Sequence, residues 1–128
     1  MNPISTDGAP KAVGPYSQAV GCNGMVFVSG QLPVDPKDGS VPDSVRDRTI
    51  RALENVRSIA EAAGCSMSDC VKVTIFMSDI SEFPDVNDAY AEMFSEPYPA
   101  RSCVEVSRIP KGMSLEIDAI FVKGQRQR

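Results

Sequence analysis

The chain has 128 residues, of which 42% are hydrophobic and 23% charged, and these proportions are ordinary for a globular protein of one domain. With 17 acidic residues against 13 basic ones, the net charge is -4, which disfavours a general nucleic-acid binder because phosphate binding rests on clustered cations. With no histidine, the chain cannot form a Ser-His-Asp triad, a Cys-His pair or an HExxH metal site.

The amino-terminal residues MNPISTDGAPKAV lack an apolar core behind a basic end, so we expect no secretory signal and a cytoplasmic protein. No stretch reaches the roughly 20 apolar residues of a membrane helix, so we expect no membrane partner. The cysteines form no CxxC pair, and we expect free, mostly buried thiols. No phosphate-binding glycine motif occurs, so no cofactor is indicated.

The first elements read from the chain are two strands and a helix. Asn23-Gly24 predicts a two-residue type I′ hairpin between strands near 17–22 and 25–30, because both positions tolerate positive φ. Between residues 44 and 63, apolar residues recur at spacings of three and four, which predicts an α-helix. Asp43 or Ser44 can cap its start.

In the second half of the sequence, we expect a strand, a helix and two further strands. Residues 71–77 (VKVTIFM) are rich in β-branched side chains, which favours a buried strand. Ser81 is the expected cap of the second helix, which we expect to end at two prolines, Pro97 and Pro99. Strands over 101–107 and 114–122 complete the order ββαβαββ. We therefore expect one α+β domain over residues 1–128, with two helices on one face of a sheet.

Two charged side chains stand out in the last strands. Arg101 lies at the start of an apolar strand, and its guanidinium can bind a carboxylate with two hydrogen bonds. Glu116 interrupts an aliphatic stripe and can polarise a water molecule. Each also has an ordinary structural interpretation. Arg101 can form an ion pair with Glu105 or Glu116, and Glu116 can belong to a solvated sheet face.

Four further residues are candidates for a polar site. The hydroxyls of Tyr16 and Ser29 bracket the first hairpin and can bind a substrate or orient water, although packing explains them equally well. Gly30 permits a close backbone approach, or simply ends a strand. Cys103 has no neighbouring histidine or lysine to make it a thiolate, so we expect an inert thiol.

Several blocks in order resemble the RidA (YjgF) family of reactive-intermediate deaminases, nearly from end to end. The blocks are residues 12–20 (AVGPYSQAV), 26–33 (VFVSGQLP), 52–56 (ALENV), 86–90 (VNDAY), 99–106 (PARSCVEV), 109–111 (IPK) and 115–119 (LEIDA). Two stretches depart from the family pattern, residues 41–44 (VPDS), where many relatives carry glycines, and Arg48, where glutamine is common. We expect these departures to alter the rim of the site or the subunit contacts.

The resemblance implies a chorismate-mutase-like fold with a mixed sheet, assembled as a homotrimer with active sites in clefts between subunits. It implies hydrolysis of 2-imino and 2-enamino acids, such as 2-aminoacrylate and 2-iminobutanoate, to 2-oxo acids and ammonia without a cofactor. By position, Arg101 corresponds to the residue that binds the substrate carboxylate, and Glu116 to the one beside the attacking water. Residues that correspond to the lining of that pocket are Tyr16, Ser29, Gly30, Asn87 and, chiefly through its backbone, Cys103.

Two alternatives remain beside the deaminase. A non-catalytic trimer that binds a small carboxylate would need Arg101 but not Glu116. A ribonuclease or translation inhibitor, or a chaperone-like activity, has also been attributed to the family. The negative net charge argues against the nucleic-acid activities, and no long exposed apolar stripe is evident for a chaperone.

Overall fold

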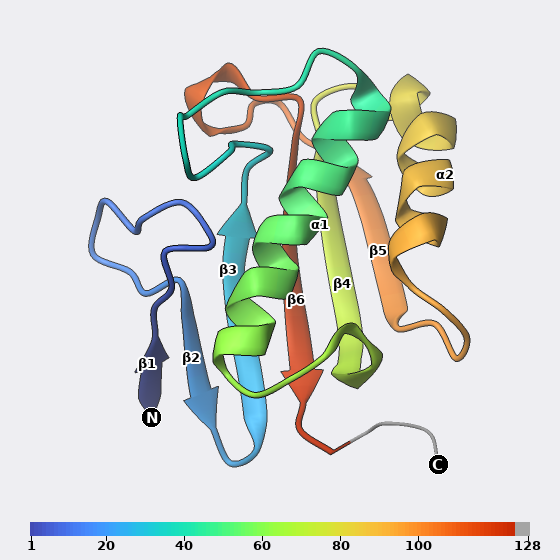
Figure 1. The fold of residues 1–128 in the computed structure, drawn as a ribbon. Helices are drawn as coiled ribbons and strands as arrows, with labels where there is room; N and C mark the ends of the chain where they lie inside the picture. The colour runs from blue at the N-terminus through green and yellow to red at the C-terminus, as the bar shows by residue number, and fades with distance from the viewer. Residues whose placement is uncertain (125–128) are drawn as a thin grey trace.

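The computed structural model describes residues 1–124 and shows one sheet covered on one face by two helices (Figure 1). The strands are Asn2–Ile4 (β1), Ala19–Cys22 (β2), Met25–Gln31 (β3), Cys70–Met77 (β4), Ala100–Glu105 (β5) and Leu115–Val122 (β6). The helices are Val45–Ala62 (α1) and Phe83–Met93 (α2), with 3-10 turns at Met67–Asp69, Ile80–Glu82 and Pro110–Gly112. The predicted α+β fold class is therefore confirmed.

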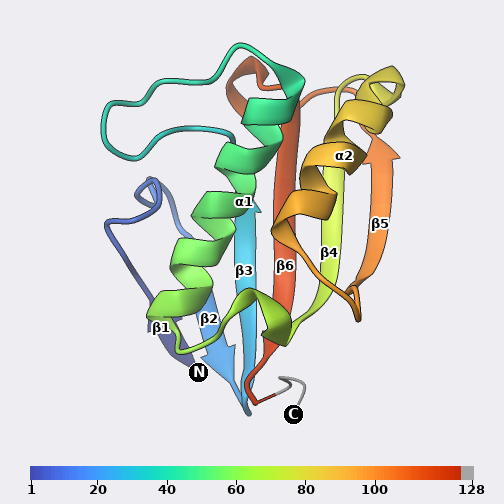
Figure 2. The same cartoon turned by 45° about the vertical axis from the view of Figure 1, so that its right-hand side comes forward.

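The strand order across the sheet is β1-β2-β3-β6-β4-β5. Every neighbouring pair is antiparallel except β4 and β5, which are parallel and joined through α2, so the sheet is mixed as predicted. Figures 1 and 2 show α1 and α2 on the same face of the sheet, with β6 near its middle and β5 at one edge. The opposite face, which we call the open face, carries no helix of the described chain.

Alternation along β6 fixes the two faces of the sheet. Leu115, Ile117, Ala119 and Phe121 are buried under the helices, so the residues between them, including Glu116 and Asp118, lie on the open face. The open face is not uniformly polar, because it includes the exposed apolar side chains Phe27 and Val104, on β3 and β5 respectively.

Local signals explain most element boundaries. Asn23 and Gly24 have φ angles of 52° and 77°, which the predicted type I′ hairpin requires. Ser44 caps α1, because its side chain accepts a hydrogen bond from the Asp47 amide at 3.0 Å. Gly64 follows that helix with a φ of 86°, where a left-handed residue ends it.

Four boundary predictions were wrong, and one of them is the start of β2, which begins at Ala19, two residues later than expected. Ser81 does not cap α2: Asp79 accepts hydrogen bonds from the amide and hydroxyl of Ser81 and starts a 3-10 turn in front of that helix. The helix also ends at Met93, before the prolines. β5 ends at Glu105, two residues early, and the short strand β1 was not predicted.

No helix in residues 1–124 is long and apolar enough to cross a membrane.

Candidate active site

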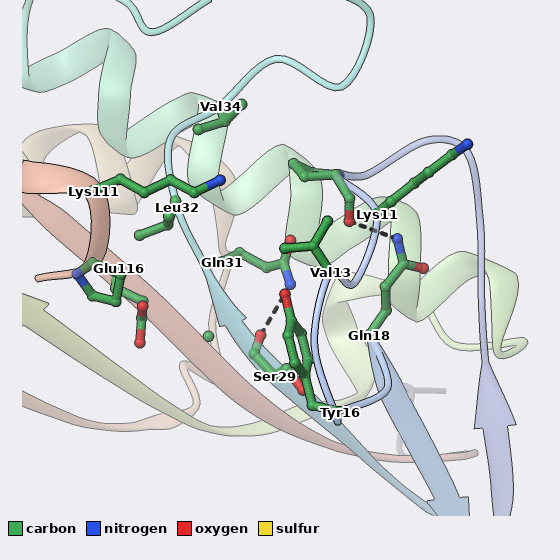
Figure 3. A pocket seen from close by; sticks show the side chains of 13 residues that line it. Lys11, Val13, Tyr16, Gln18, Ser29, Gln31, Leu32, Val34, Lys111 and Glu116 are labelled. Carbon is green, nitrogen blue, oxygen red and sulfur yellow. Dashed lines mark hydrogen bonds between the residues drawn. The ribbon is translucent and has the colours of Figure 1, made fainter. Parts of the chain in front are cut away.

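Two cavities contain six of the seven predicted site residues. The larger one, which we call the Glu116 cleft, has a volume of about 500 Å³ and lies where β3 and β6 meet two irregular segments of chain (Figure 3). Its lining includes four of the predicted residues, namely Tyr16, Ser29, Gly30 and Glu116. The cleft therefore combines hydroxyl groups, a carboxylate and a glycine in one space.

Glu116 lies directly over Gly30. A β-carbon built on Gly30 would lie 2.3 Å from the Oε2 atom of Glu116 and 2.6 Å from its Cδ, so only glycine leaves room for the carboxylate there. Burial, together with the nearby charge of Asp118, raises the pKa of Glu116 above its ordinary value. A half-buried carboxylate of raised pKa is suited to accept a proton from water near neutral pH.

Tyr16 enters the cleft from the segment before the first hairpin, and Ser29 enters it from β3 of that hairpin. The hydroxyl of Ser29 donates to the carbonyl oxygen of Ser17 at 2.6 Å, and its amide donates to the carbonyl oxygen of Gln18 at 2.9 Å. These bonds tie the chain beside Tyr16 to β3. The Tyr16 side chain, 51% exposed, lies beside Ser29 in the cleft (Figure 3). Both hydroxyl oxygens can still accept a hydrogen bond.

The second cavity, which we call the Arg101 recess, has a volume of about 420 Å³ and lies between α2 and the start of β5. The Arg101 guanidinium stacks over the ring of Tyr90 at 4.7 Å and that of Phe83 at 5.3 Å, and donates to Asn87 Oδ1 at 2.8 Å. Within residues 1–124, Arg101 forms no ion pair, so the predicted alternative of a bond to Glu105 or Glu116 is not found. Its remaining donors are available to an anion.

Cys103 lines neither cavity. Its thiol donates to the sulfur of Met77 at 3.3 Å and faces the helix-covered side of the sheet. Burial raises the pKa of Cys103, and the positive charge of Arg101 only partly opposes that shift. A neutral thiol turned towards the core is a poor nucleophile.

The cleft and the recess are separate within one chain. Arg101 packs against α2 on the helix-covered face, whereas Glu116 lies on the open face. They also lie at different heights of the sheet, because Arg101 pairs with Val73 near the start of β4 and Glu116 pairs with Phe76 near its end. One chain therefore does not bring the two principal side chains together.

Sequence reasoning missed some of the side chains around both cavities. Phe83 and Tyr90 were not predicted as site residues, yet they share one helical face with Asn87, and this spacing could have indicated a platform for a cation. Lys111 lines the cleft with a φ of 60°, and no sequence signal besides the following glycine indicates that conformation. No group of three or more potential metal ligands occurs in the part of the chain that the structure describes.

Arg48, which departs from the family pattern, stabilises the loop before α1. Its guanidinium donates to the carbonyl oxygens of Pro42 and Asp43 and to the hydroxyl of Ser114, the residue before β6. Neither cavity includes Arg48 in its lining.

The profile of the family described as Endoribonuclease L-PSP matches residues 6–123. A protein of Salmonella typhimurium named 2-iminobutanoate/2-iminopropanoate deaminase is 49% identical over 123 residues, which cover 94% of this chain and 96% of that protein. The crystal structure of Escherichia coli TdcF with bound serine superposes with a TM-score of 0.93 and 46% identity, covering 97% and 100% of the two chains. The YjgF gene product of Escherichia coli gives a TM-score of 0.92 at 45% identity, covering 96% and 99%.

Proposed function

The chain belongs to the Endoribonuclease L-PSP family, which includes the RidA and YjgF proteins, and from this membership we propose that it hydrolyses 2-imino and 2-enamino acids. The products are 2-oxo acids and ammonia, and the reaction needs no cofactor. The main structural support is the environment of Arg101. Its guanidinium packs against two aromatic rings and donates to the side-chain amide of Asn87 at the edge of the recess.

Arg101 is proposed to bind the carboxylate of the substrate. The rings of Phe83 and Tyr90 lie against the guanidinium, and Asn87 accepts a hydrogen bond from it, so little rotational freedom is lost when a planar anion binds. The bound carboxylate places the adjacent imine carbon at a defined distance from the arginine. That anchoring would favour 2-imino acids over imines that lack a carboxylate.

Glu116 is proposed to orient and deprotonate the attacking water, with Tyr16 and Ser29 as neighbouring hydroxyl groups. Water adds to the carbon of the protonated imine, its proton passes to Glu116, and a carbinolamine forms. Return of that proton from Glu116 to nitrogen makes ammonia the leaving group. As the C–N bond breaks, the remaining hydroxyl proton passes to Glu116 and the 2-oxo acid forms. A 2-enamino acid first gains a proton at C3 to become the protonated imine. Because the protonated imine is already electrophilic, positioning supplies most of the rate.

The complete site is proposed to form between protomers of a homotrimer. Arg101 and Glu116 lie on opposite faces of one sheet, so a substrate that contacts both needs the recess of one protomer against the cleft of another. The open face supports such an assembly, because Phe27 and Val104 are 38% and 41% exposed in the single chain and would be covered.

Three properties of the chain bear on where it acts and on the two other candidate functions, a ribonuclease and a carboxylate sensor. All four cysteines are free thiols, which fits the reducing cytoplasm where we propose that the enzyme acts. The ribonuclease activity in the family description is not extended to this chain, because a net charge of -4 opposes phosphate binding. A sensor that only binds carboxylates would have no use for a carboxylate of raised pKa in the cleft.

A coupled assay tests the proposed activity. A serine dehydratase generates 2-aminoacrylate, and pyruvate formation is followed with and without the protein. We expect acceleration above the spontaneous rate that is proportional to protein concentration. Equal rates with and without the protein, for the imines derived from both serine and threonine, would contradict the proposal. Glu116→Gln should still bind a 2-oxo acid but lose turnover. If the protein only binds carboxylates, wild type and Glu116→Gln would bind equally and neither would accelerate pyruvate formation.

A further inference from the structure

The two walls of the Glu116 cleft are irregular segments of chain. The first wall, residues 6–13, contributes Pro10, Lys11 and Val13, and the second, residues 32–36, contributes Leu32 and Val34. Neither segment contains a helix or strand, so no ladder of backbone hydrogen bonds fixes its position. A cleft of defined width therefore requires other contacts that hold these walls in place.

Gln18 holds the first wall. Its side chain is almost fully buried, with the residue 4% exposed. The Oε1 atom accepts from the amide of Thr6 at 2.7 Å, and Nε2 donates to the carbonyl oxygens of Pro10 at 2.8 Å, Thr6 at 3.1 Å and Ala9 at 3.3 Å. The orientation of the carboxamide is fixed chemically, because its nitrogen faces carbonyl oxygens and its oxygen faces an amide. Figure 3 shows this side chain beside Lys11 and Val13.

Asn55 holds the second wall in the same way. It is fully buried on α1, and its Nδ2 atom donates to the carbonyl oxygens of Leu32 at 3.1 Å and Val34 at 2.9 Å. The Arg51 side chain donates to Asn55 Oδ1 at 2.9 Å, which leaves the nitrogen directed at the wall. The two carboxamides come from different elements and hold different walls of one cleft.

We propose that Gln18 and Asn55 are positioning residues that set the width of the Glu116 cleft, an inference that rests on the proposed function of that cleft. Both lie within sequence blocks that resemble the family, yet neither has a part in the chemistry proposed for Arg101 and Glu116. A neutral carboxamide suits the task, since it satisfies buried carbonyl groups without the cost of burying a charge.

The proposal makes a specific kinetic prediction. Loss of a wall contact leaves Glu116 and Gly30 in place on β6 and β3, so the chemical step is largely preserved and substrate binding weakens. KM should rise by roughly 10-fold with a much smaller change in kcat, because a displaced wall weakens binding of substrate and transition state alike, while Glu116 and the water it orients stay in place. A destabilised but correctly shaped protein behaves differently: fewer active molecules lower the apparent kcat while KM stays the same.

The test compares Gln18→Met and Asn55→Leu with Thr49→Val as a matched control. Thr49 is fully buried on the same helix as Asn55, and its hydroxyl donates to the Val45 carbonyl oxygen within that helix rather than to either wall. Gln18→Asn and Asn55→Ser, which change the site less, replace any variant that fails to fold. Thermal unfolding, kcat, KM and amide hydrogen exchange are measured for each, at a temperature where all are folded.

We expect faster exchange over residues 6–13 in the Gln18 variants only, over residues 32–36 in the Asn55 variants only, and a raised KM in both. Unchanged exchange in the two walls, or an unchanged KM with lowered kcat as in Thr49→Val, would overturn the proposal. Wild-type protein without imine turnover would instead contradict the proposed function, and the exchange pattern would still decide whether the carboxamides hold the walls.

Discussion

The Arg101 recess and the Glu116 cleft place their charged side chains in opposite environments, one exposed to solvent and the other half-buried. Arg101 is exposed on the edge strand β5, with aromatic rings beneath its guanidinium and solvent around its free donors. Glu116 is half-buried on the central strand β6, above a glycine and beside a second carboxylate, and its pKa is raised. The recess keeps a permanent charge accessible, whereas the cleft makes the carboxylate hold its proton more strongly.

This difference matches the two tasks in the proposed reaction. An anchor for a carboxylate should stay charged at every physiological pH, and arginine does so without help. A group that takes a proton from water works best when its pKa lies near the working pH, and a surface glutamate falls well below that value. The comparison therefore predicts that changes in the recess weaken binding and that changes to Glu116 or to Gly30 beneath it slow the chemical step.

The largest effect is expected from Arg101→Ala. Loss of a charged hydrogen-bonding partner costs about 1.5–3 kcal/mol, so kcat/KM should fall roughly 10- to 100-fold. Arg101→Lys keeps the charge but loses the planar fork and much of the ring stacking, and should recover only part of that loss. Steady-state kinetics with 2-aminoacrylate and 2-iminobutanoate measure both.

Arg46→Ala is the matched control for Arg101→Ala. Arg46 is an exposed arginine on α1 that pairs with Asp47 and Glu92 and lines neither cavity. It should leave kcat/KM within experimental error. Wild-type kinetics in Arg101→Ala would remove the arginine from the proposed mechanism.

Mixed oligomers should show the next largest effect. Alone, Arg101→Ala should keep only about 1–10% of the wild-type kcat/KM, and Glu116→Ala should lose most of its turnover. If the site spans two protomers, co-expression of the two should restore about a quarter of the sites, since a site then draws its arginine and its glutamate from different chains. Activity of tandem-tagged mixed oligomers and their mass by light scattering are the measurements. Mixtures no more active than the separate variants would place the site within one chain.

Gly30→Ala should lower kcat about 10-fold while KM changes little. A methyl group on Gly30 would lie 2.3 Å from the Glu116 carboxylate, so the side chain must rotate away from its position in the cleft. Gly21→Ala is the control, because its β-carbon would meet no atom closer than 3.8 Å. Equal kinetics in the two variants would show that the position of Glu116 is unimportant.

The smallest effect is a shift in pH dependence for Asp118→Asn. The reaction needs Glu116 as a carboxylate, so activity falls as pH drops through its pKa, which lies above the ordinary 4.5. Burial is the main cause of that raised value and remains in the variant, while the contribution of the Asp118 charge is lost. The acidic limb of kcat/KM should therefore move to lower pH with little change at the plateau. A limb that moves to higher pH would contradict the assignment.

Most of the fold could be predicted because periodicity and turn chemistry agreed with each other. Asn23-Gly24, the apolar spacing over α1 and the β-branched run of β4 each identify an element by local physics. β1 is only three residues long and contains Pro3, so it is too short to show the alternation of apolar and polar residues that predicts a strand. Ser81 was misread because Asp79, two residues earlier, binds the amide that the serine was expected to leave free.

The site was less predictable than the fold because it depends on contacts between distant residues. Alternation correctly separated Glu116 from the buried face of β6, but it could not show that Gly30 on another strand leaves the space its carboxylate occupies. Pattern also could not show that Arg101 and Glu116 lie on different faces of the same sheet. That result depends on the register with β4, in which Arg101 pairs with the buried Val73 and Glu116 pairs with Phe76 on the open face.

The position of β6 has a consequence for how the chain is made. This strand follows all the others in the sequence, yet it lies between β3 and β4 and joins the two halves of the sheet. A growing chain on the ribosome can form the β2–β3 hairpin early, but the halves have no shared strand until β6 emerges. Folding should therefore be completed late and in one step, so that incomplete chains lack both an ordered sheet and the carboxylate that β6 carries.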